Sequence, residues 1–283
     1  MRLTLFLVFF SATLSLCQNA LSQQQPGAAQ PPDAEHNVTD LAKTTQNPVG
    51  DVVSVPFQFN FNSGGAFKDQ TLFNLNIQPV IPIHITKNWT YIARTIIPVN
   101  SIPTSTTTSS SGFGDIQEQT FFSPAHPGKL IWGVGPAFSF PTATASPAKT
   151  GTWAGGGSAV FLAMPGPFVL GSLFTQLSPM HDSNGKPKVN SFLWQYFVNY
   201  NFGKGWALTT APSMTADWTA SSGQKWTIPV GGGIARTLVF NKQPMTLGMQ
   251  YYYNVKRPDT AASTTLRFVI ALIYPQKPAP PPH

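Results

Sequence analysis

Residues 72–86 read LFNLNIQPVIPIHIT and alternate between apolar and polar side chains. The odd positions are apolar almost without exception, from Phe73 to Ile85. The even positions include four polar residues: Asn74, Asn76, Gln78 and His84. A two-residue period is the repeat of a β-strand, and about fifteen residues is long for a strand in a soluble protein. A soluble sheet would turn this apolar face inward, whereas a barrel in a lipid membrane would turn it outward.

Composition favours the membrane. Charged residues make up 10% of the 283 residues, well below the roughly one quarter that is usual for soluble domains. The 27 Pro and 23 Gly interrupt the chain too often for long helices. The formal net charge is +7, but the basic residues are spread thinly along the chain, which argues against a nucleic-acid partner.

The N-terminus has the form of a signal peptide over residues 1–22. Arg2 precedes an apolar run that ends at Cys17, and Ala20 and Ser22 are small residues placed for cleavage. Lipidation at Cys17 is the alternative, although the bulky Leu16 stands where a small residue is expected. Cleavage after Ser22 would give an exported chain without cysteine, and therefore without disulfides.

Three further regions follow the predicted leader. Residues 23–50 form a Pro/Gln-rich linker with a short helix over 38–46, and residues 276–283 form a Pro-rich tail. Residues 51–275 form the barrel domain. No later segment offers eighteen consecutive apolar residues, so no transmembrane helix is predicted.

The barrel region predicts about twelve strands. They cover residues 52–61, 72–85, 89–99, 114–122, 130–140, 155–164, 168–177, 191–201, 205–216, 225–240, 245–255 and 262–274. The connections after even-numbered strands are tight, and those after odd-numbered strands are longer and polar, as in NSIPTSTTTSSSG (100–112). This alternation is typical of an all-β, closed antiparallel transmembrane barrel with short periplasmic turns and long outer loops, in the outer membrane of a Gram-negative cell.

Alternation also divides the side chains between lipid and lumen. Polar groups on the inward faces give the predicted pore-lining set: Asn74, Asn76, Gln78, His84, Arg94, Asp115, Gln195, Asn199, Arg236, Gln250 and Arg267. The same groups would alternatively hold a narrow lumen rigid by bonding across it. Residues 38–49 form either a small plug in this lumen or a periplasmic tether. Pro79 and Pro82 each remove a backbone donor from the ladder, which predicts a bulge there or near the lower rim.

Several phrases of the sequence resemble one bacterial outer-membrane family. They cover nearly the whole chain after the linker: 41–64, 112–124, 132–144, 197–218 and 225–255, the last reading KWTIPVGGGIARTLVFNKQPMTLGMQYYYNV. Members of this family are labelled transporters, phenol-degradation MetA-pathway proteins or, misleadingly, neuromedin U. The resemblance implies an outer-membrane barrel that passes small organic molecules, with no catalytic residues. Many such barrels end on an aromatic residue that assists assembly, so here the assembly signal would have to be LRFVIALIY (266–274), ahead of the tail.

One motif suggests an enzyme instead. His181 to Gly185 read HDSNG, which resembles a stretch of outer-membrane phospholipase A, with His181 as base and Ser183 as nucleophile. The orienting Asn of that family would be replaced by Gln195, which alternation turns into the lumen.

The sequence therefore predicts a channel or transporter-like barrel for small, hydrophobic or aromatic organic solutes. We expect no catalytic site, metal or cofactor. The predicted partners are outer-membrane lipid, a small-molecule solute and the barrel-assembly machinery. The alternatives are a phospholipase-like hydrolase and a non-conducting structural or adhesion barrel.

Overall fold

The structure is a computed structural model that describes residues 32–180 and 189–275. The chain divides into two compact units, Met1–Glu35 and His36–His283, and the second contains the whole sheet. The predicted signal peptide, residues 23–31 of the linker, the HDSNG motif and the Pro-rich tail lie outside the described residues.

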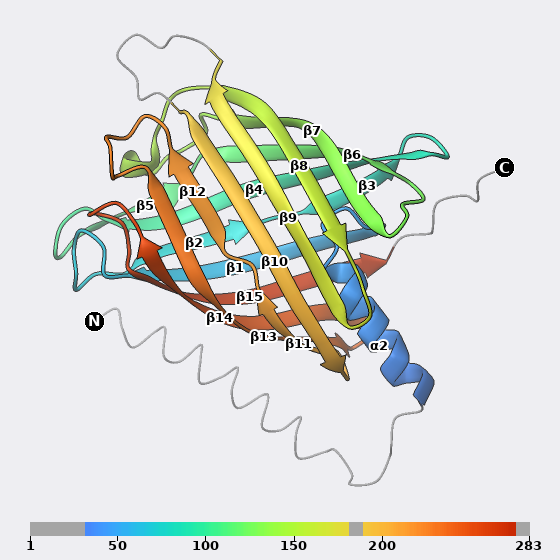
Figure 1. Cartoon of the computed structure of the whole chain (residues 1–283). Helices are drawn as coiled ribbons and strands as arrows, with labels where there is room; N and C mark the ends of the chain where they lie inside the picture. The colour runs from blue at the N-terminus through green and yellow to red at the C-terminus, as the bar shows by residue number, and fades with distance from the viewer. Residues whose placement is uncertain (1–31, 181–188, 276–283) are drawn as a thin grey trace, which may run out of the picture. The chain divides into compact units, whose positions relative to one another are not determined.

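In the described residues, fifteen strands form one antiparallel sheet that closes on itself (Figure 1). They are β1 (Val52–Ser63), β2 (Leu72–Ile77), β3 (Val80–His84), β4 (Trp89–Pro103), β5 (Ser109–Phe113), β6 (Ile116–Pro124), β7 (Leu130–Phe140), β8 (Ala154–Ala163), β9 (Phe168–Pro179), β10 (Ser191–Gly203), β11 (Trp206–Thr210), β12 (Ser213–Asp217), β13 (Trp226–Phe240), β14 (Gln243–Lys256) and β15 (Thr264–Pro275). The pairing of β1 with β15 closes the barrel. The pairs β2/β3, β5/β6 and β11/β12 are each two halves of one wall strand, so the predicted twelve-strand barrel is confirmed.

Turn chemistry separates the two ends of the barrel. The β13–β14 connection is the residue pair Asn241 and Lys242, whose φ angles of 47° and 66° give the mirror-image turn that matches the twist of a hairpin. The β7–β8 connection at the other end is much longer and contains the 3-10 turn η1 (Ser146–Ala148). Short connections at one end and long ones at the other agree with the prediction, so we call these the short-turn end and the long-loop end.

The apolar face points outward. In β3 and the residue after it, Ile81, Ile83 and Ile85 are 42–51% exposed, whereas Val80 and Pro82 are buried inside the barrel. Exposed apolar side chains likewise cover the outer faces of β10 and β14. A closed barrel with an apolar outer surface belongs in the outer membrane.

Helices contribute little to this fold. In the described ranges, no helix is long and apolar enough to cross a membrane.

The prolines of the opening stretch interrupt the strand without a bulge. Phe57↔Ile77 and Ser54↔Val80 follow one register on both sides of the break, and β3 pairs regularly with β4 as far as His84. The Gln78 N–H still donates to the Pro56 carbonyl at 2.9 Å. The predicted bulge is therefore wrong at these prolines, because neighbouring donors and acceptors bridge the break without an extra residue.

Helix α2 (Pro32–Thr45) precedes β1, and its residues 36–45, which belong to the barrel unit, lie at the short-turn end (Figure 1). The helix predicted over 38–46 is present and begins earlier, at Pro32. Behind it, the side-chain amides of Gln46 and Asn201 donate to each other at 2.9 and 3.1 Å. Val49 then enters the barrel and is only 6% exposed. Of residues 38–49, the last one, Val49, thus lies inside the barrel as the plug alternative expects.

Val49 joins an apolar cluster that fills the short-turn half of the lumen. The other buried members of this floor cluster are Val80, Ile92, Phe121, Ile131, Val160, Leu162, Val169, Leu173 and Phe197. Most of them lie on strands β6 to β10, close to a short connection. This half of the barrel is therefore closed by packed side chains.

The barrel's orientation in lipid predicts a depth-dependent cost for charge on the outer face. Met249 is half exposed in the middle of β14. Its replacement by Arg is expected to destabilise the folded barrel by roughly 2–4 kcal/mol. Val255→Arg, near the long-loop end of the same strand, should cost about 0–1 kcal/mol. Denaturant titration of refolding into liposomes measures both, and equal costs would contradict the assigned membrane depth.

Candidate functional site

A polar chamber of about 480 Å³ occupies the long-loop half of the barrel. Its lining is rich in amides and has few charges: Gln58, Asn60, Asn62, Leu72, Asn74, Asn76, Gln78, Arg94, Ile96, Pro98, Asn100, Gln117, Leu193, Gln195, Pro212, Ser213, Thr227, Pro229, Tyr252, Asn254, Thr265 and Arg267. These residues come from strands β1, β2, β4, β6, β10, β12 to β15 and the breaks between strand halves. Leu193 also packs against the floor cluster, so that cluster forms the bottom of the chamber.

Cross-strand amide bonds organise one wall of the chamber. Asn60, Asn74 and Asn100 stand opposite one another on β1, β2 and β4. Asn60 Nδ2 donates to Asn74 Oδ1 at 3.0 Å, and Asn74 Nδ2 donates to Asn100 Oδ1 at 2.8 Å. Pairs at this spacing stabilise a sheet, and their remaining polar atoms face the chamber.

Two arginines complete the lining. Arg94 donates from Nη1 to Gln119 Oε1 at 2.7 Å and from Nη2 to Gln78 Oε1 at 2.8 Å. Arg267 donates from Nε to Asn60 Oδ1 at 2.7 Å and lies 5.0 Å from the ring centroid of Tyr252. Both guanidinium groups are thus fixed by neutral partners.

An apolar vestibule of about 370 Å³ lies above the chamber, at the long-loop end. Eight of its thirteen lining residues are apolar or glycine, and the lining combines loop residues with strand ends: Asn62, Gly65, Ala66, Phe67, Gln70, Leu72, Ile102, Pro103, Thr227, Asn254, Thr260, Ala261 and Ala262. Asn62, Leu72, Thr227 and Asn254 line both cavities. The vestibule and the chamber therefore adjoin.

The barrel wall has one long interruption beside the chamber. β13 pairs with β11 as far as Thr209↔Gly233 and with β12 only from Thr215↔Thr227. Between these pairs, residues 210–214 face residues 228–232 without ladder pairing. We call this stretch the wall gap. Pro212, Ser213 and Pro229 lie in it and also line the chamber.

Side chains supply hydrogen bonds to backbone groups of Ala211 and Gly231 in the wall gap. The Ala211 N–H donates to the Tyr252 hydroxyl at 3.0 Å. The Ala211 carbonyl accepts from Gln195 Nε2 at 3.3 Å and from Arg267 Nη1 at 3.2 Å. The Thr210 hydroxyl donates to the Gly231 carbonyl at 2.6 Å. Pro212 and Pro229 have no N–H to satisfy, so the wall tolerates the missing ladder.

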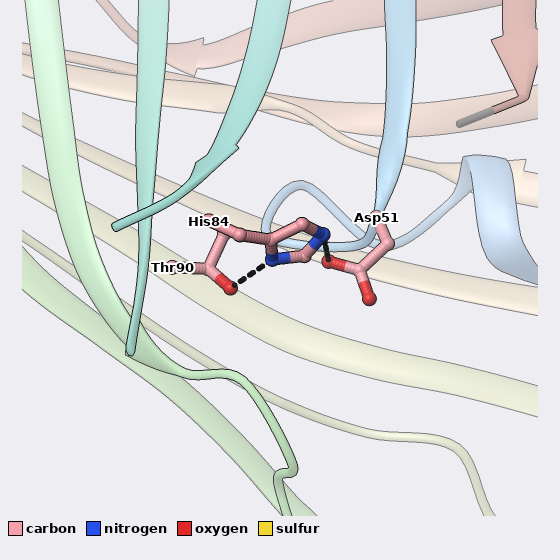
Figure 2. A network of polar contacts seen from close by, with 3 residues as sticks. All are labelled: Asp51, His84 and Thr90. Carbon is pink, nitrogen blue, oxygen red and sulfur yellow. Dashed lines mark hydrogen bonds and ion pairs between the residues drawn. The ribbon is translucent and has the colours of Figure 1, made fainter. Parts of the chain in front are cut away.

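His84 lies at the opposite end of the barrel, outside the chamber lining. Figure 2 shows its ring between Thr90 and Asp51. Nδ1 lies 3.1 Å from the Thr90 hydroxyl, and Nε2 lies 3.8 Å from the Asp51 carboxylate. The contact joins the end of β3 to the residue that precedes β1, so His84 belongs to the short-turn rim.

Ten of the eleven predicted pore-lining residues separate into four groups. Six line the chamber: Asn74, Asn76, Gln78, Arg94, Gln195 and Arg267. Asn199 and Gln250 are buried inside the barrel but do not line this cavity. Asp115 accepts hydrogen bonds from the Ala143 N–H and the Thr150 hydroxyl, which fixes the β7–β8 loop. His84 is on the short-turn rim.

Arg236 is the clear correction, because it lies on the outer face. It stands opposite Trp206 and Leu247, and Leu247 is exposed on the lipid side. Its guanidinium lies 5.0 Å from the centroid of the Trp206 ring, close to a short turn. A cation is tolerated there because it can reach the membrane interface along an aromatic ring.

Tyr252 is the residue that the sequence prediction missed. It lies between Tyr251 and Tyr253, whose side chains are exposed on the lipid face. Its position shares the inward parity of Gln250, to whose Oε1 its hydroxyl donates at 3.0 Å. Parity alone identifies Tyr252 as inward-facing, but only the fold brings the wall gap to its hydroxyl.

Of the phospholipase-like arrangement, the structure describes Gln195 alone. Gln195 bonds Ala211 inside the barrel, whereas Trp194 is exposed on the outer face. His181 and Ser183 fall outside the described residues. Within the described ranges there is no group of three His, Cys, Asp or Glu side chains placed to hold a metal ion.

Comparisons with known proteins support the fold. No family model matches the chain, and no curated protein matches it either. Among solved structures, it is similar to the COG4313 outer membrane channel from Pseudomonas putida F1, with a TM-score of 0.60 and 14% identity over 87% of this chain and 100% of that one. A Salmonella typhi outer membrane phospholipase has a TM-score of 0.42 and 10% identity, covering 77% of this chain and 89% of that one. The CymD monoaromatic hydrocarbon channel has a TM-score of 0.43 and 9% identity, covering 85% and 91%.

Removing one hydroxyl tests how the wall gap is held. Tyr252→Phe leaves the Ala211 N–H without its acceptor and should destabilise this contact by roughly 1–3 kcal/mol. We expect faster hydrogen exchange at residues 210–213, measured by mass spectrometry on the refolded barrel. Tyr251→Phe is the matched control, because that hydroxyl lies on the exposed face. Equal exchange in the two variants would show that Tyr252 does not hold the gap.

Proposed function

We propose that this barrel is an outer-membrane channel that takes up small organic solutes and releases them sideways through the wall gap. The proposal rests on what surrounds the chamber. The vestibule adjoins it above, a packed apolar floor lies below, and the wall gap lies at its side. The likeness in fold to the COG4313 outer membrane channel agrees with this proposal.

The properties of each part indicate the kind of solute. The vestibule presents Phe67, Leu72 and Ile102, which favour a solute with an apolar or aromatic surface. The chamber presents amides that hydrogen-bond a polar substituent of the same solute. The resemblance of several sequence phrases to phenol-degradation MetA-pathway proteins supports the same aromatic class.

Two partners belong to this proposal. The exit would deliver solute to outer-membrane lipid. The barrel-assembly machinery would recognise the β15 sequence LRFVIALIY, the last strand to close the wall.

Uptake by cells distinguishes a channel from an adhesion or structural barrel. Gram-negative cells that express this barrel should accumulate the apolar probe 1-N-phenylnaphthylamine faster than cells with the empty vector, as measured by its fluorescence. Planar-bilayer recordings should show little ionic current, because the floor cluster closes the direct route. Unchanged probe uptake with the barrel present and folded would contradict the proposal.

Cross-linking the wall gap tests the exit. The register on both sides of the gap places Ser213 opposite Pro229. The chain has a single natural cysteine, Cys17, within the predicted leader, so Ser213→Cys with Pro229→Cys introduces a unique pair. Joining the pair with a bis-methanethiosulfonate reagent should reduce uptake to the empty-vector level, and a reducing agent should restore it.

The matched control cross-links two residues where β11 and β13 pair regularly. Leu208→Cys with Ile234→Cys lies on the outer face, in the regular ladder of β11 and β13. Cross-linking there should leave uptake unchanged. Loss of uptake with both pairs would contradict a specific exit at the wall gap.

A further inference from the structure

The two chamber arginines have only neutral hydrogen-bond acceptors around them. Arg94 bonds the amides of Gln78 and Gln119, and Arg267 bonds the amide of Asn60 and the carbonyl of Ala211. Among residues 38–180 and 189–274, Asp51 with His84 is the one ion pair within 4.0 Å. Neither guanidinium therefore has a carboxylate partner in that part of the chain.

Three of the described acidic side chains make contacts away from the two arginines. Glu118 stands opposite Thr95 on the outward face of the wall. Its carboxylate accepts a hydrogen bond from the Thr95 hydroxyl at 2.6 Å. Asp115 holds the β7–β8 loop, and Asp51 lies at the short-turn rim. Charged side chains within a membrane protein are normally paired or functional, because isolating them from water is costly. Two uncompensated cations in one chamber create a positive potential there.

One hydrogen-bond donor beside Arg94 also has no acceptor. Gln119 is 1% exposed, and its Oε1 accepts from Arg94 while its Nε2 is buried without a partner. Arg94 and Arg267 each retain N–H groups beyond the bonds described above. A ligand that only accepts hydrogen bonds complements this arrangement, and a carboxylate is such a group.

The wall gap sets the shape of the rest of the ligand. Arg267 bonds Ala211, which lies in the gap, and Pro212 and Pro229 line the same chamber as both arginines. A molecule whose head group reaches Arg267 can thus extend an apolar body toward these prolines and the lipid beyond. The chamber volume of about 480 Å³ admits the head and part of a short chain.

We propose that the chamber binds amphiphiles with a carboxylate head and an apolar body, and that Arg94 and Arg267 hold the carboxylate. The inference rests on the proposed channel function and narrows its substrate class from organic solutes in general to organic monoacids. It assigns the two arginines to ligand binding rather than to holding the wall.

Calorimetric titration of the refolded chain in dodecyl maltoside tests the site directly. Octanoate is expected to bind saturably with one molecule per barrel, and octanol, which has the tail without the charge, at least about tenfold more weakly. Arg94→Gln and Arg267→Gln should each weaken octanoate binding roughly tenfold or more, because each removes a charged hydrogen-bond donor. Arg267→Lys should retain more affinity than Arg267→Gln, because it keeps the charge.

Arg236→Gln is the matched control, since that arginine lies on the outer face over Trp206. It should bind octanoate as the parent chain does. Equal affinity of the parent for octanoate and octanol, or the same loss in Arg236→Gln as in the two chamber variants, would overturn the proposal. Circular dichroism and the heat-dependent gel mobility of a folded barrel establish folding. If a chamber variant does not fold, the proposal is tested by the ratio of the parent chain's affinities for octanoate and octanol.

Binding and uptake separate this inference from the channel function. Saturable octanoate binding without uptake of 1-N-phenylnaphthylamine would support the anion site and contradict the channel. Uptake of that probe without octanoate binding would support the channel and overturn the anion site.

Discussion

The hydrocarbon of a bilayer offers no hydrogen bonds, and every other feature of this barrel follows from that constraint. A closed ladder meets it along most of the wall, from the β1–β15 closure around to the pairing of β9 with β10. At the wall gap the ladder is missing. Two prolines remove donors there, and Tyr252, Gln195 and Arg267 supply the bonds that the Ala211 backbone would otherwise lack. An opening in the wall is thus compatible with a stable barrel.

The same constraint divides the lumen into two halves with different chemistry. Near the short turns, Val49 and the strand residues around it exclude water and need no polar partners. Near the long loops, the amides of Asn60, Asn74 and Asn100 bond one another across three strands. A solute that enters from the vestibule meets a polar chamber with a closed floor. In the proposed route, the solute leaves this chamber through the wall gap.

Alternation along single strands predicted much of this site before the fold was known. It placed six of the eleven proposed residues in the chamber, and it turned the isoleucines after Pro79 toward lipid. Arg236 was misplaced because the stretch VGGGIAR contains three glycines and gives no apolar rhythm. Only pairing with Trp206 and Leu247 identifies its face. Asp115 was misplaced because it lies at the break between β5 and β6, where side-chain parity does not apply.

By itself, the sequence determined the fold class, the number of wall strands, the alternation of turns and loops, and the direction of most side chains. These properties are local, because each follows from the two-residue period of a strand and from turn chemistry. The tertiary structure decided which polar residues meet. It brought Arg267 of β15 and Tyr252 of β14 to Ala211, closed the floor with Val49, and left residues 210–214 without ladder pairing to residues 228–232. Such contacts join strands that are distant in sequence, so they depend on how the barrel closes.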